Sequence, residues 1–147
     1  DAGPLSSTMT VADRQALVDS LIRHEGLRLA PYPDTAGKIS IGYGRNLTDK
    51  GISNREAQIL LDHDIDDALA DALTFSWFPA LDAVRQRVVV EMIFNLGLPK
   101  FSKFTATIHA ITAGDYLAAA ERMRDSLWFR QVGQRAVTLS NLMEHGA

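Results

Sequence analysis

Two carboxyl groups in the N-terminal third of the chain, those of Glu25 and Asp34, have the side-chain types that general acid–base catalysis requires. At about 100° per residue, Glu25 shares a helix face with Leu17 and Leu21, so we expect burial to raise its pKa. Asp34 lies in a loop rich in Pro and Gly, where solvent and backbone amides favour the ionised form. A protonated acid paired with an ionised one is the division of roles that cleaves a glycosidic bond.

Each carboxyl group also has a purely structural interpretation. Glu25 ends a predicted helix, where its side chain could extend into solvent or pair with Arg23 or Arg28. Asp34 has the position of a turn residue, and turn aspartates commonly accept hydrogen bonds from their own backbone.

The sequence next predicts a strand that has only small residues on one face. Residues 31–44 (PYPDTAGKISIGYG) predict a β-hairpin with its turn near residues 34–37. We expect Ser40 to offer a hydroxyl that holds a water, while Gly42 and Gly44 admit a bulky ligand. The glycines fit a bulge or sharp bend equally well. The other face, which we expect to anchor the hairpin, carries Ile39, Ile41 and Tyr43.

The elements that position these groups are predicted to be mostly helical. Thr10 can cap a helix that runs to about Glu25 and ends at Gly26. Ser53 and Glu56 form a capping box that opens a long helix, ending near residue 73.

A second set of helices is predicted further along the chain. Asp82 caps an apolar helix that ends at Gly97 and is expected to form the centre of a second core. Shorter helices are predicted near residues 103–112, 116–125 and 133–143, separated by Gly114 and by residues 128–129.

The composition excludes several classes of protein. The chain has 147 residues, a net charge of −3 and no Cys, which excludes disulfides and thiolate metal sites. Its charge argues against nucleic-acid binding, and its apolar runs are too short to span a membrane. The histidines have no metal-ligand spacing, and Asp62, Asp64 and Asp66 lack the glycine and glutamate of a calcium loop, so we predict no metal and no cofactor. Because the sequence starts at Asp1, we expect a processed product or part of a longer chain; residues 1–9 have no signal-peptide pattern.

Several segments of the chain resemble the T4-type phage lysozymes, the endolysin muramidases of glycoside hydrolase family 24. The family pattern is Glu, eight residues, Asp, five residues, Thr, and this chain has Glu25, Asp34 and Ser40 at the same spacing. The likeness continues to nearly the end of the chain. It is carried by residues 24–29, by Tyr32, Gly37 and residues 40–44, and then by residues 81–85, 94–97, 104–105 and 126–129.

The resemblance implies hydrolysis of the β-1,4 bond between N-acetylmuramic acid and N-acetylglucosamine in peptidoglycan. Glu25 would protonate the leaving oxygen, while Asp34 and Ser40 would position a water for an inverting displacement. Such a mechanism requires carboxyl groups roughly 6.5–9.5 Å apart. The resemblance also implies substrate-binding roles for Tyr32, Phe94, Asn95 and Arg135, with Arg135 approaching the catalytic Glu. For Phe94, core packing is the simpler interpretation.

Two positions depart from the family. Ser40 replaces the usual threonine, so it keeps the hydroxyl but loses the methyl group that restricts the rotamer. Arg45 replaces a histidine that pairs with an acid on the following helix, and we hypothesise an Arg45–Asp64 pair. Gly42 and Gly44 would support the site through their backbone.

The implied fold is α+β and mostly helical: a lysozyme-like two-lobe fold with a small β-hairpin sheet in the N-terminal lobe. A flexible tail (residues 1–9) would precede a single catalytic domain (residues 10–147). That domain would comprise an N-terminal lobe at about residues 10–55, a connector helix at about 54–74 and a helical lobe at about 76–147. We expect a monomer that is made in a host cytoplasm, acts on cell-wall peptidoglycan during bacterial lysis, and inserts into no membrane.

Two other functions remain open on the sequence alone. A non-catalytic wall-binding or phage structural module could retain the same fold, although it would need neither Glu25 nor Asp34. A lytic transglycosylase would use a single acid and no water, so Asp34 would be dispensable and the products would carry anhydro ends.

Overall fold

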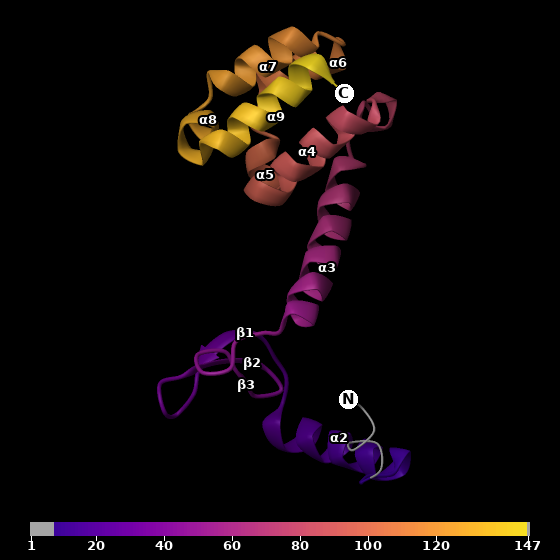
Figure 1. Ribbon diagram of the computed structural model, residues 1–147, viewed down its shortest axis with the longest axis vertical. Coiled ribbons are helices and arrows are strands. Elements are labelled where there is room, and N and C mark those ends of the chain that lie inside the picture. Colours follow the sequence, from indigo (N-terminus) through magenta and orange to yellow (C-terminus); the bar gives the residue numbers. More distant parts are fainter. Residues whose placement is uncertain (1–7, 147) are drawn as a thin grey trace. The chain divides into compact units, whose positions relative to one another are not determined.

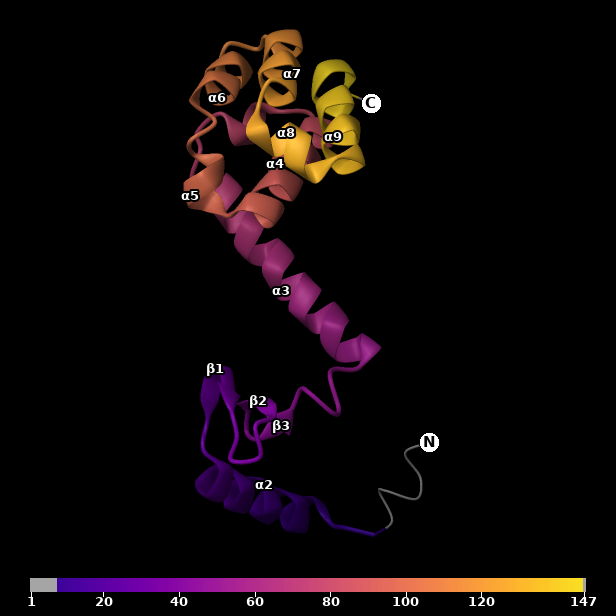
Figure 2. The same cartoon turned by 90° about the vertical axis from the view of Figure 1, so that its left-hand side faces the viewer.

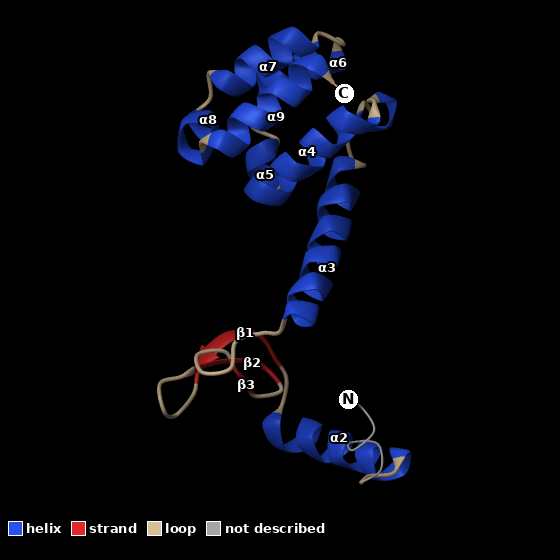
Figure 3. Ribbon diagram, in the orientation of Figure 1, coloured by secondary structure: helices blue, strands red, loops and turns tan. Residues whose placement is uncertain are grey.

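The computed structural model describes residues 8–146, so most of the tail predicted at residues 1–9 lies outside the described part. The described residues form eight α-helices and one three-stranded antiparallel sheet (Figures 1 and 3). This confirms the predicted α+β, mostly helical class. None of these helices is long and apolar enough to cross a membrane. The chain divides into two compact units, residues 1–57 and 58–147.

The first unit begins with helix α2 (Val11–Glu25), which has the predicted caps. The Thr10 hydroxyl accepts a hydrogen bond from the Asp13 amide at 3.0 Å, and Gly26, with a φ of 69°, ends the helix. No residue of α2 is buried, and Leu17 and Leu21 are about half exposed. The apolar face of α2 is therefore not enclosed as the periodicity predicted.

The sheet of this unit consists of β1 (Arg28–Pro33), β2 (Ile39–Gly42) and β3 (Arg45–Asn46) in that order. The predicted hairpin is confirmed, whereas β3 is too short to leave a sequence pattern. The prediction of which face anchors the sheet is wrong, because Ser40 is 4% exposed while Ile39 is 41% exposed. Ser40 lies in the central strand, where Tyr32 pairs with it on one side and Asn46 on the other.

Helix α3 (Asn54–Ala72) opens with the predicted capping box. The Ser53 hydroxyl accepts from the Glu56 amide at 3.1 Å, and the Glu56 carboxylate accepts from the Ser53 amide at 2.8 Å. The buried residues of α3 are Ala68 and Ala72.

The second unit is entirely helical over its described residues. It contains the 3-10 turn η1 (Phe78–Ala80), α4 (Ala83–Leu96), α5 (Leu98–Phe101), α6 (Thr105–Thr112), α7 (Tyr116–Arg124), α8 (Leu127–Val132) and α9 (Gln134–His145). Helix α7 packs against both α6 and α9, and α9 packs against α4 (Figures 1 and 2). Residues 128–129, predicted to separate helices, lie inside α8 because the Ser126 hydroxyl accepts from the Phe129 amide and caps that turn.

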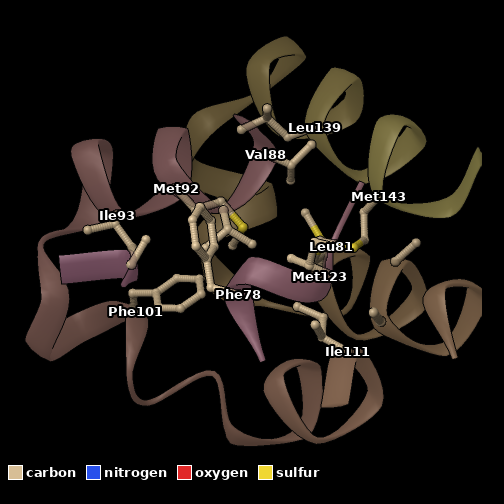
Figure 4. Close-up of a cluster of buried hydrophobic side chains, with 14 of the residues drawn as sticks. Phe78, Leu81, Val88, Met92, Ile93, Phe101, Ile111, Met123, Leu139 and Met143 are labelled. Carbon is tan, nitrogen blue, oxygen red and sulfur yellow. The ribbon is translucent and has the colours of Figure 1, made fainter. Parts of the chain in front are cut away.

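Helix α4 lies at the centre of the hydrophobic core, as predicted. It buries Val88, Val89, Met92 and Ile93. In Figure 4 the side chain of Met92 lies beside Phe78, which comes from η1. The predicted cap is also present, since the Asp82 carboxylate accepts from the amide of Arg85.

The Arg85 side chain joins the start of α4 to the end of α9. Its guanidinium donates to the carbonyls of Met143 at 2.7 Å and Glu144 at 2.9 Å, and it pairs with Asp82 at 3.0 Å. The same group lies 3.8 Å from the centre of the Tyr116 ring. Because the last carbonyls of a helix have no partner within the helix, Arg85 satisfies groups that would otherwise need water.

Replacement of Arg85 should therefore destabilise the second unit more than replacement of an unpartnered arginine. We expect Arg85→Met to lower the free energy of unfolding by about 3 kcal/mol, since charged hydrogen bonds are lost while most of the packing remains. Arg130→Met is the control, because Arg130 is exposed and has no side-chain partner within residues 8–146. Urea denaturation measures both variants, and equal losses would contradict the role assigned to Arg85.

Candidate active site

Glu25 is the last residue of α2, and its carboxylate lies against the backbone of Gly44. A Cβ atom built on Gly44 would be only 2.8 Å from Glu25 Oε2. Gly44 also has a φ of 80°, which side-chain-bearing residues rarely adopt. Glu25 is exposed and makes no side-chain hydrogen bond within residues 8–146, so its predicted burial is wrong and its carboxyl group is available to a ligand.

Asp34 follows β1 directly and organises the turn of the hairpin. Its Oδ1 accepts hydrogen bonds from the amides of Ala36 and Lys38, both at 2.9 Å. Its own amide donates to the Lys38 carbonyl at 2.7 Å. The structural interpretation of Asp34 is thus confirmed. These bonds use one carboxylate oxygen, so the turn fixes the direction of the carboxylate while its Oδ2 takes no part in them.

The Ser40 side chain lies in the middle of the sheet, on β2. Its hydroxyl makes no hydrogen bond to any described residue, and no polar side-chain atom in residues 8–146 is both enclosed and unpartnered. The hydroxyl must therefore remain in contact with solvent even though the residue is 4% exposed. A water molecule can bind at such a group.

Tyr32 lies opposite Ser40 in the β1–β2 ladder. It is half-buried, and the Arg28 guanidinium lies 4.5 Å from the centre of its ring. The hairpin therefore carries Tyr32, Asp34 and Ser40. Gly44 lies just beyond the end of β2 and contacts Glu25.

Arg45 pairs with Glu56 and not with the predicted Asp64. Its Nη1 and Nη2 donate to the two carboxylate oxygens of Glu56 at 2.9 and 2.6 Å, and Nη1 also donates to the Gly51 carbonyl at 3.2 Å. The Arg45 guanidinium, together with the Ser53 amide and hydroxyl, lowers the pKa of Glu56 from 4.5 to about 2. The predicted link between the hairpin and α3 exists, but it is made to the first turn of the helix.

Phe94 and Arg135 line a groove of about 780 Å³ in the second unit. Phe94 is 41% exposed, so the simpler interpretation, that its side chain packs in the core, is wrong. Arg135 Nε donates to Glu91 Oε2 at 2.8 Å. The groove is otherwise mostly apolar, with Leu61, Ile65, Leu69, Phe78 and Val90 among its lining.

Asn95 follows Phe94 on α4 and is held by Trp128. The Trp128 Nε1 donates to Asn95 Oδ1 at 2.8 Å, and the Trp128 ring meets Phe104 edge-on with centroids 6.1 Å apart. Phe104 stacks in turn with the buried Phe101. The Asn95 amide is thus fixed by an indole that is itself anchored in the core.

Asp64 lines a notch of about 230 Å³ between α3 and α4, together with Asp67 and Asp71. No group of three or more His, Asp or Glu side chains within residues 8–146 is arranged to hold a metal ion.

Two residues with clear roles were not identified in advance as site residues. Glu56 was assigned only to the capping box, although a carboxylate at the start of a helix is also accessible to a neighbouring cation. Glu91 could have been found as the one charge within the run Val88–Ile93 of an apolar helix.

Comparison with known proteins gives a family match over most of the chain. Residues 22–144 match the family model described as phage lysozyme. The chain is 29% identical to the pre-baseplate central spike protein Gp5 of Enterobacteria phage T4, over 99% of this chain but only 31% of that protein. It is 30% identical to the SAR-endolysin of Escherichia phage Mu, over 85% of this chain and 72% of the relative. It is also 26% identical to the probable T4-type lysozyme 2 of Dictyostelium discoideum, over 89% and 95% of the two chains.

The Arg45–Glu56 pair predicts a specific dependence of stability on pH. Because the pKa of Glu56 is held at about 2 in the folded state against 4.5 ordinarily, the contribution is fully present above about pH 4.5 and is lost as pH falls toward 2. The difference in unfolding midpoint between the wild type and Glu56→Gln should therefore be constant near neutral pH and shrink across this window.

Thermal unfolding followed by circular dichroism measures this difference. Asp62→Asn is the matched control, since Asp62 is an exposed carboxylate on the same helix with no side-chain partner in the described part of the chain. A wild-type advantage over Glu56→Gln that persists to pH 2 would contradict the assigned pair.

Proposed function

Because the chain belongs to the phage lysozyme family, we propose that it is a peptidoglycan hydrolase that cleaves the β-1,4 bond between N-acetylmuramic acid and N-acetylglucosamine. The observation that carries the proposal is the match over residues 22–144, which includes Glu25, Asp34 and Ser40 at the family's spacing. The reaction needs one group that donates a proton, one that accepts a proton and a site for one water molecule.

Glu25 is the proposed general acid. Its carboxyl group donates a proton to the glycosidic oxygen as the bond from that oxygen to the anomeric carbon breaks. Its exposure and the lack of side-chain hydrogen bonds to it within residues 8–146 support this role, because a carboxyl group already committed to the protein would not reach a substrate oxygen.

Asp34 and Ser40 are the proposed water-positioning groups. Asp34 accepts a proton from the water that attacks the anomeric carbon, and the Ser40 hydroxyl orients the same water. The fixed Asp34 turn and the solvent contact of the Ser40 hydroxyl support these roles. Attack from the face opposite the leaving group inverts the β-linkage, so the new reducing end is formed as the α-anomer.

Tyr32, Phe94, Asn95 and Arg135 are proposed to bind the substrate. Tyr32 neighbours Ser40 in the sheet, which supports a contact with sugar near the reacting bond. The hydrogen bond from Trp128 to Asn95 and the ion pair of Arg135 with Glu91 hold two polar groups in defined orientations, as polar recognition of a sugar or peptide requires.

Lysis of the bacterial wall is the proposed setting, and the likeness to the Mu SAR-endolysin supports it. The likeness to the T4 spike protein favours a second setting, in which the same hydrolase forms one part of a phage structural protein. The chain spans 31% of that relative's length, and both settings rely on the same cleavage.

Loss of either carboxyl group should abolish cleavage without unfolding the protein. We expect Glu25→Gln and Asp34→Asn each to slow the clearing of a peptidoglycan suspension about a thousandfold, the contribution typical of a positioned acid or base. Far-UV circular dichroism verifies the fold of each variant, and mass spectrometry identifies the products.

The outcome separates the alternatives. An Asp34→Asn variant that keeps its activity and releases anhydro ends would establish a lytic transglycosylase. A wild-type protein that binds peptidoglycan but cannot clear it would be a binding module, and the proposed function would fail.

Ser40 gives a finer test of the proposed water site. We expect Ser40→Ala to lower kcat roughly tenfold or more, because the water loses one orienting partner, whereas Ser40→Thr retains the hydroxyl and most of the activity. Turnover of soluble peptidoglycan fragments measures both variants. Equal activity of the alanine variant and the wild type would exclude a role for the hydroxyl.

A further inference from the structure

The Glu25 carboxylate lies close to the turn at Gly44. Any side chain on residue 44 would have its Cβ atom 2.8 Å from Glu25 Oε2, so the Gly44 backbone defines one wall of the space that this carboxylate can occupy. A shift of the turn would therefore change the directions in which Glu25 can point.

The turn is followed by a very short strand. Strand β3 contains only Arg45 and Asn46, which pair with Ile41 and Ser40 of β2. Two residues make few ladder hydrogen bonds, and strands of this length have little stability of their own. The chain just beyond β3 also bonds to β2, because the Leu47 amide donates to the Ile39 carbonyl at 2.7 Å and the Ile39 amide donates to the Thr48 hydroxyl at 2.8 Å. A side chain can add a further anchor at the start of β3, next to Gly44.

Arg45 supplies that anchor through its guanidinium group. Two parallel hydrogen bonds of 2.9 and 2.6 Å join it to the carboxylate of Glu56, which is the geometry that restricts both side chains most strongly. Glu56 is itself fixed, because it also accepts from the Ser53 amide at 2.8 Å. The link thus runs from the rigid first turn of α3 to the residue next to Gly44.

From these contacts we infer that Arg45 and Glu56 form a positioning pair for Glu25. The pair holds the Gly44 backbone against the Glu25 carboxylate and thereby limits the orientations of the proposed proton donor. Neither residue needs to touch the substrate, since both act through Gly44. The catalytic part of this inference rests on the function proposed above, whereas the positioning of the carboxylate does not.

A second ion pair in the same unit provides a matched control. Lys38 and Asp49 are joined at 3.1 Å, and their side chains are 42% and 58% exposed. Asp49→Asn removes this pair but keeps an oxygen that can accept the existing hydrogen bond from Asn46. It therefore removes an ion pair from the unit without touching the link from Glu56 to Gly44.

The kinetic test compares Arg45→Lys, Glu56→Gln, their double variant and Asp49→Asn on soluble peptidoglycan fragments, with rates corrected for the folded fraction. Arg45→Lys keeps the charge but cannot form the two-pronged contact, so it tests the geometry without a gross loss of stability. We expect Arg45→Lys and Glu56→Gln to lower kcat roughly tenfold with KM unchanged.

Two further results are expected of the same series. The double variant should lose no more than the worse single variant, because the two residues act as one unit, and Asp49→Asn should match the wild type. An unchanged kcat in Glu56→Gln would overturn the inference, as would an equal loss in Asp49→Asn.

An NMR measurement separates this inference from the proposed function. The side-chain carboxyl carbon of Glu25 should shift in Glu56→Gln and stay in place in Asp49→Asn. If the wild type cleaves no peptidoglycan but the resonance shifts, the positioning contact stands and the proposed function fails. If the wild type cleaves and the resonance does not move, the positioning pair is refuted.

Discussion

The close approach of a carboxylate to a backbone without a side chain is the contact on which the candidate site depends. Glu25 Oε2 lies only 2.8 Å from the position that a Cβ atom on residue 44 would take, and Gly44 has a φ of 80°. A larger residue would displace the Glu25 carboxylate and would adopt an unfavourable backbone conformation. The backbone conformation therefore favours glycine at this position, and the neighbouring contacts of Arg45 and Glu56 hold the turn.

The two units are stabilised by different kinds of interaction. In the second unit, α4 buries Val88, Val89, Met92 and Ile93 in a hydrophobic core. Aromatic contacts connect the buried Phe101 to Phe104 and Trp128, and Trp128 donates a hydrogen bond to Asn95. Among residues 8–57, Ser40 is the one buried side chain. That unit relies on the Thr10 cap, the Asp34 turn, the Ser53–Glu56 capping box and the Arg45 guanidinium contact. Asp34 thus has both a structural role and a proposed chemical role.

The sequence predicted the features that local chemistry determines. Caps at Thr10 and Asp82, the capping box at Ser53 and the turn at Asp34 were each confirmed, because each involves residues within a few positions of one another. Properties set by distant parts of the chain were predicted less well. The exposure of Glu25 and the burial of Ser40 depend on which surfaces meet, and periodicity assigned both incorrectly. The partner of Arg45 was placed on the correct helix, but at Asp64 instead of Glu56, because sequence spacing does not reveal which turn of that helix the arginine reaches.

These differences bear on how the proposed acid would work. Sequence periodicity placed Glu25 among apolar side chains and assigned its protonation to burial, whereas its described neighbour is the Gly44 backbone and its surface is exposed. A carboxyl group in that position gains orientation from the turn, and orientation alone can contribute several kcal/mol to a rate when reacting atoms are held in line. The features that matter most for Glu25 are then the ones that fix Gly44. Arg45 and Glu56, which hold this turn, are then as much a part of the site as the residues that would contact the sugar.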